Sequence, residues 1–63
     1  MAPDLQLVKI WEHATFGAGY VGDAIKARRD DPKQDVTKEL GEALVELEKA
    51  TAELRKILAT SHL

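Results

Sequence analysis

Glutamates in the second half of the chain have a spacing that could serve metal chemistry. On a helix, separations of three, four and seven residues place them along one edge, where carboxylates can share a hard cation such as Mg²⁺. The edge consists of Glu39, Glu42, Glu46 and Glu53. Lysines run beside it at positions 38, 49 and 56, three or four residues from a glutamate. A solvated flank held by salt bridges is therefore the competing interpretation.

The segment KELGEALVEL, residues 38–47, resembles a glutamate-bearing helix of the MazG-type nucleotide pyrophosphohydrolases. The resemblance implies an oligomeric, helical, metal-dependent hydrolase with Glu39, Glu42 and Glu46 as candidate ligands. Those enzymes bring further acidic ligands from another helix, whereas the first helix predicted here supplies only Glu12 and Asp23. A hydrolase of this type is kept as an alternative, and the main expectation is a protein without enzymatic activity, metal or other cofactor.

Nucleophilic chemistry has little support in the sequence. The single serine is Ser61, and cysteine is absent, so neither residue suggests a catalytic triad. His13 could accept a phosphoryl group, because an exposed imidazole is a nucleophile. Its surroundings, WEHATFG, show neither the leucine-proline pattern of sensor kinases nor a phosphotransfer-domain pattern. An ordinary surface histidine is the better interpretation.

A binding surface is indicated in the first half of the chain. If residues 4–29 form one helix, the outer face of that helix carries Lys9, His13, Phe16 and Tyr20. Such a surface could bury its aromatic rings against a protein partner, or stack them on unpaired RNA bases. The competing interpretation is that the rings pack within the protein itself. We expect a binding or adaptor protein with a protein partner, and RNA binding is the alternative.

The elements that position these residues are two helices. Residues of about 35–60 repeat apolar side chains in steps of four and three, including Leu40, Leu47 and Leu54, with alanines between them. This stripe is wider than one neighbouring helix covers, so the helix should contact two. Its start is marked either by a capping box at residues 31–34 or by Asp35 as a cap.

The first helix is predicted over about residues 4–29, with Asp4 as its cap and a turn over about 30–34. Its apolar seam follows the same steps and consists of Leu7, Trp11, Ala14, Ala18, Val21 and Ile25. Three glycines interrupt it, at positions 17, 19 and 22, and each costs a helix about 1 kcal/mol relative to alanine. Either the small residues allow another backbone to come close, or the helix breaks at Gly17–Gly19 into a three-helix arrangement.

Composition favours a single all-α domain over residues 1–63 that associates with a second copy. A chain of 63 residues without cysteine has neither disulfides nor a large core to stabilise it, which leaves oligomerisation. Two hairpins with broad stripes would form a homodimeric four-helix bundle, an architecture that resembles the Rop-type plasmid copy-number regulators. The net charge of −2 makes nucleic acid an unlikely partner without excluding it. No signal-like or membrane-spanning run is present, so we expect a cytoplasmic protein without a membrane partner.

Overall fold

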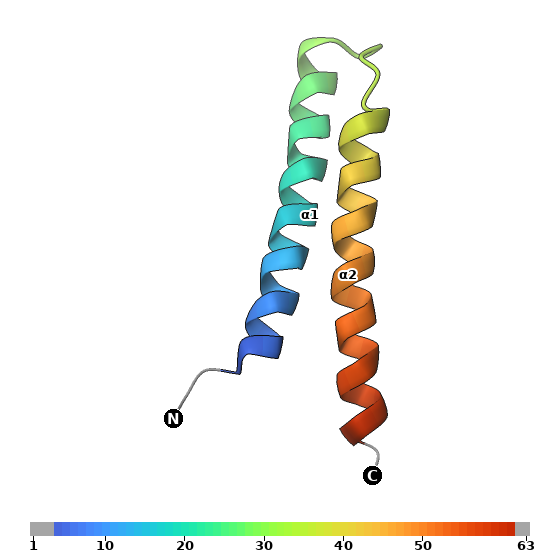
Figure 1. The fold of residues 1–63 in the computed structure, drawn as a ribbon. Coiled ribbons are helices and arrows are strands. Elements are labelled where there is room, and N and C mark those ends of the chain that lie inside the picture. The colour runs from blue at the N-terminus through green and yellow to red at the C-terminus, as the bar shows by residue number, and fades with distance from the viewer. Residues whose placement is uncertain (1–3, 62–63) are drawn as a thin grey trace.

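The protein folds as a helical hairpin. The structure, a computed structural model, describes residues 4–61. It contains α1 (Leu5–Asp30) and α2 (Thr37–Ser61), which run side by side in opposite directions and are joined by residues 31–36 (Figure 1). Each helix begins and ends within two residues of the predicted positions. The described residues form no strand, which confirms the all-α hairpin.

The start of α1 follows from a capping aspartate, as predicted. The Asp4 carboxylate accepts hydrogen bonds from the backbone nitrogens of Gln6 at 3.0 Å and Leu7 at 3.3 Å. These bonds satisfy two of the amides that have no partner inside the first helical turn. The helix then continues without a break through all three glycines. The alternative arrangement of three helices, with a break at Gly17–Gly19, is therefore wrong.

The start of α2 shows which of the two predicted caps is used. The Asp35 carboxylate accepts hydrogen bonds from the Thr37 backbone nitrogen at 2.9 Å and from the Thr37 hydroxyl at 2.6 Å. These bonds hold the pKa of Asp35 below its ordinary value, because they favour the ionised form. The capping box over residues 31–34 is wrong, since Asp31 ends α1 and its carboxylate instead accepts from the Lys33 backbone nitrogen within the turn.

The seam between the helices has a different phase on α1 from the one predicted. The side of α1 that turns toward α2 carries the buried or half-buried residues Gln6, Ile10, His13, Gly17, Tyr20, Ala24 and Ala27. The predicted seam lies one residue later along the chain, so it is rotated by roughly 100° and its large side chains are exposed. Most of these residues therefore do not pack against α2, and their assignment to a dimer seam stays a prediction.

The helix α1 covers only part of the apolar stripe that is predicted for α2. Val36, Ala43 and Ala50 are buried against α1, whereas the three leucines at positions 40, 47 and 54 stay exposed. Within residues 4–61 the buried hydrophobic residues are these three and Ala24, and none of the large side chains there is fully buried. The hairpin core is therefore made of small side chains.

Close contact between the helices explains Gly17. A Cβ atom added at this position would lie 2.7 Å from Cγ of Leu47 and 3.4 Å from the backbone oxygen of Ala43. Cβ atoms added at Gly19 and Gly22 would meet nothing within 4 Å. Packing inside the hairpin therefore requires glycine at only one of the three positions.

The shape of the hairpin is elongated and one helix thick. Its principal extents are 49 × 23 × 13 Å, and its radius of gyration is 15.1 Å. A compact chain of this length would have a radius of gyration of about 11 Å. Neither of the described helices is long and apolar enough to cross a membrane.

The close approach predicts different effects of alanine at two glycines. Gly19→Ala should stabilise the protein by up to about 1 kcal/mol, because alanine favours the helix and the new methyl group meets no obstacle. Gly17→Ala should give no such gain, since its methyl group would displace Leu47. Urea unfolding at one fixed protein concentration measures both. Equal stabilisation by the two variants would contradict the close contact at Gly17.

Candidate functional site

Polar side chains from both helices meet along one side of the seam. The amide nitrogen of Gln6 donates to a Glu53 carboxylate oxygen at 3.2 Å, and Nδ1 of His13 lies 2.7 Å from Oε2 of Glu46. In both pairs the residue numbers add up to 59, which fixes the register of the antiparallel helices. This register places Tyr20 level with Glu39. The three pairs lie seven residues apart along each helix.

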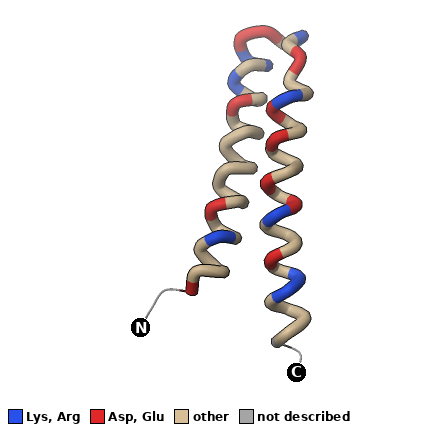
Figure 2. Tube along the Cα trace, viewed as in Figure 1, with Lys and Arg blue, Asp and Glu red and all other residues tan. Residues whose placement is uncertain are grey.

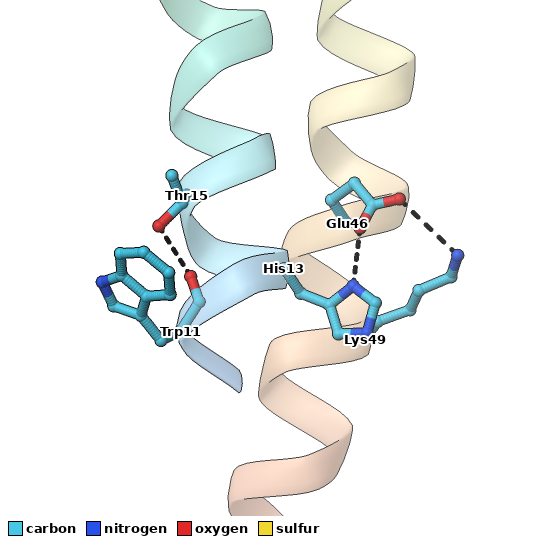
Figure 3. Close-up of polar contacts among 5 residues, drawn as sticks. All are labelled: Trp11, His13, Thr15, Glu46 and Lys49. Atoms are coloured by element: carbon cyan, nitrogen blue, oxygen red, sulfur yellow. Dashed lines mark hydrogen bonds and ion pairs between the residues drawn. The ribbon is translucent and has the colours of Figure 1, made fainter. Parts of the chain in front are cut away.

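The position of His13 differs from the prediction. It was expected on the outer face of α1, but it is half-buried and points toward α2, as Figure 3 shows. The other oxygen of Glu46, Oε1, lies 3.6 Å from Nζ of Lys49 (Figure 3). The reason is the rotated phase of α1, which brings His13 into the seam. Whether His13 contacts a partner remains a prediction.

The polar contacts lower the pKa values of two glutamates. The hydrogen bond from His13 is the main reason that the pKa of Glu46 lies below its ordinary value, and Lys49 adds to the effect. For Glu53 the hydrogen bond from Gln6 is the main cause, followed by Lys56, with a smaller attraction from Lys9. Both carboxylates are therefore held in their charged form by neighbours on one side of the hairpin.

Two sites that the sequence suggested separately form one surface in the structure. Lys9 acts electrostatically on Glu53, and His13 bonds to Glu46, so the predicted binding residues of α1 border the glutamate edge of α2. We call this surface the polar face. It consists of Lys9, His13, Phe16, Tyr20, Glu39, Glu42, Glu46 and Glu53.

The aromatic part of the polar face borders a shallow hollow. Phe16 is 55% exposed, as predicted, whereas Tyr20 is half-buried because the seam runs beside it. The hollow has a volume of about 300 Å³ and is lined by Thr15, Phe16, Gly19, Tyr20 and Asp23. A side chain at Gly19 would project from this surface, so glycine keeps the hollow open.

The structure does not assemble the glutamates into a metal site. Among the described residues, no group of three acidic or histidine side chains is placed to hold a metal ion. Glu46 is engaged by His13 and Lys49 instead. One oxygen of Glu39 is buried and has no hydrogen-bond partner in the described part of the chain, but a single such atom provides only one ligand.

The opposite side of the hairpin is apolar. On both helices, most of the residues that follow a seam position are hydrophobic, and in an antiparallel pair these positions fall on the same side. A hollow of about 450 Å³ on this side is lined by residues of both helices, among them Val21, Ile25 and Leu40. We call this side the apolar face. Its large residues are Leu7, Trp11, Val21, Ile25, Leu40, Leu44, Leu47, Leu54 and Leu58.

The middle of α1 is free of charged side chains. Figure 2 shows a long stretch of α1 without Lys, Arg, Asp or Glu, and the sequence places it at residues 13–22. The largest ring on the apolar face, that of Trp11, is 66% exposed and points away from α2 (Figure 3). An uncharged helix surface with an exposed indole ring can be removed from water at little electrostatic cost.

The basic cluster at the turn contributes to local structure. Nε of Arg28 donates to the backbone oxygen of Gln34 at 2.6 Å, which ties the end of α1 to the segment before α2. Arg28 and Arg29 also lie in the last turn of α1, where positive charge complements the helix dipole. These contacts give the two arginines a structural role at the turn.

The lowered pKa of Glu46 predicts a specific pH dependence. A carboxyl group whose pKa is lowered by folding contributes stability above its ordinary value of 4.5, and this contribution is lost as the pH falls through the lowered value. Glu46→Gln should therefore reduce the drop in melting temperature between pH 6 and about pH 3. Glu48→Gln, on the exposed side of α2, should leave the drop unchanged; circular dichroism melts measure both. An equal drop in wild type and Glu46→Gln would contradict the role of the His13 contact.

Comparison with known proteins assigns no family to this chain. No family model matches it, and neither a curated protein nor a solved structure does. Its function must therefore be inferred from the side chains that the hairpin brings together.

Proposed function

We propose that the protein is a homodimeric binding protein. Two hairpins pack through their apolar faces into a four-helix bundle, and the polar face of each copy remains outside to bind a protein partner. The apolar face supports this proposal most strongly. It carries nine of the thirteen large hydrophobic side chains that are exposed in the described part of the chain. Such a continuous apolar surface is typical of an interaction site.

Surface area supports a second copy as the occupant of the apolar face. The hairpin exposes 5186 Å², whereas a compact monomer of 7.0 kDa would expose roughly 4,000 Å². The excess of roughly 1,100 Å² exceeds the approximately 800 Å² that each partner buries in a stable interface of standard size. Self-association through the apolar face would therefore bring the protein to the surface area expected of a folded globule.

The polar face supports a protein partner over RNA. Phe16 provides an exposed aromatic ring of the kind that anchors protein interfaces. Carboxylates lie near it, at Glu39 and Glu42 on α2 and Asp23 on α1, and they would repel a phosphate backbone. The same surface offers no assembled cation site for the hydrolase alternative. A protein partner with an apolar side chain and a basic neighbour fits these properties best.

The dimer is tested by two adjacent residues on opposite sides of α2. Leu44 is 57% exposed and lies on the apolar face, whereas Val45 is 50% exposed and points away from the hairpin. Because the two differ little in exposure, lysine at either position should affect the isolated hairpin similarly. Leu44→Lys should abolish the dimer and Val45→Lys should keep it, as measured by sedimentation equilibrium. A wild-type protein of 7.0 kDa at micromolar concentration would contradict the proposal.

The binding role of the polar face is tested by removing the Phe16 ring. Phe16→Ala should retain helicity and dimer mass, because the ring is largely exposed, and should lose the partner. Val8→Ala on the outer side of α1 is the matched control and should retain it. Affinity capture with the three proteins, followed by quantitative mass spectrometry, measures the difference. Identical sets of captured proteins would contradict recognition through Phe16.

A further inference from the structure

We infer that the two hairpins of the dimer lie with their turns at the same end of the bundle, so that α1 of each copy packs on α2 of the other. This inference rests on the proposed homodimer and specifies its interface. A twofold axis can relate two hairpins face to face in two ways. An axis parallel to the helices places α1 on α2 of the second copy. An axis across the helices reverses one hairpin and places like helices together.

Side-chain volumes on the apolar face support the first arrangement. The central part of α1 on this face carries a strip of two small residues, Ala14 and Ala18, followed by Val21. The corresponding part of α2 is a row of leucines, Leu40, Leu44 and Leu47. By the register of the hairpin, residues 14–22 of α1 are level with residues of about 37–45 of α2. The strip of small residues on α1 and the row of leucines on α2 therefore lie at nearly the same position along the long axis of the hairpin.

The tilt of the side chains brings the leucines of α2 closer to the small residues of α1 along the hairpin axis. Side chains of a helix tilt toward its N-terminus, and for α2 this direction is toward the turn. Leu47 shows the tilt, because its Cγ and Cδ2 atoms lie 2.7 and 2.8 Å from a Cβ built at Gly17, although residue 47 is level with residue 12 or 13. The leucines of one copy would thus enter the small strip of the other when the turns lie together.

The remaining residues of the apolar face fit the same arrangement. Trp11, the largest side chain of α1 on this face, lies nearly level with Thr51, which is small. Large side chains would then face small ones over the middle of the interface, which favours dense packing there. With the turns at opposite ends, leucines would face leucines and the small strip would face α1. The two hairpins would then have to lie close together where α1 faces α1 and far apart where α2 faces α2.

An oppositely charged pair at the end of the hairpin away from the turn also agrees with this arrangement. Asp4 and Arg55 flank the apolar face on its two outer edges, and their numbers add up to the 59 that defines the register. With the turns together, Asp4 of one copy lies beside Arg55 of the second copy.

Spin labels at the turn distinguish the two arrangements. The chain has no cysteine, so Lys33→Cys in the exposed turn provides one labelling site per copy. Turns at the same end should give a distance between labels of about 30 Å or less, which is set by the width of the bundle. Turns at opposite ends would place the labels near the 49 Å length of the hairpin. A dimer with the longer distance would overturn the inference and leave the proposed dimer intact, whereas a monomer would overturn both.

Disulfide formation provides an independent measurement. We would prepare two variants separately, Ala18→Cys and Leu44→Cys. The two proteins are then mixed, left until their subunits exchange between dimers, and mildly oxidised. The inferred arrangement places residue 18 of one copy near residue 44 of the other, so the mixed disulfide should predominate. Disulfides between identical variants, in place of the mixed product, would overturn the inference. Mass spectrometry of the covalent dimers measures the ratio.

Discussion

The close approach of the two helices is the constraint on which the rest of the structure depends. Gly17, Ala24, Ala43 and Ala50 let α1 and α2 come near each other, and at Gly17 even one added Cβ atom would meet Leu47. The seam therefore accommodates small residues and, on one side, the pairs Gln6 with Glu53 and His13 with Glu46. Large hydrophobic residues must lie outside the seam, and the chain collects most of them on one face. The exposure of these residues, on which the proposed dimer rests, thus follows from how closely the hairpin packs.

This division matches the different roles that we propose for the two faces of the molecule. The apolar face has the area and shape for a permanent contact, since its leucines and tryptophan gain most from leaving water. The polar face is suited to reversible contact, because charged side chains surround its exposed aromatic ring. In the proposed dimer the two polar faces point in opposite directions, so one bundle would present two equivalent binding surfaces. Separation of assembly from recognition is the property expected of an adaptor.

The sequence predicts most of the fold because its signals are local. Asp4 and Asp35 are recognisable caps, and the steps of three and four residues define two helices of nearly equal length. The rotational phase of α1 could not be predicted in this way. Hydrophobic periodicity locates the apolar stripe, but it does not reveal whether the second helix or another molecule covers it. On α1 the true seam is half polar, so its strongest signal was Gly17, aligned with Ala24 at a spacing of seven.

Polar positions recur every seven residues along the seam, and this has a consequence for how the hairpin can change in length. On α1 the recurring positions are Gln6, His13 and Tyr20, and on α2 they are a series of glutamates at equal spacing. A shift of α2 by one whole repeat would still offer a glutamate to two of these three α1 positions, so the chemistry of the seam distinguishes these alignments only weakly. The six residues that join the helices exclude the shift, because they are too few to allow it. Insertions and deletions of seven residues should accordingly be tolerated in natural variants of this hairpin, while other lengths would turn the glutamates away from α1.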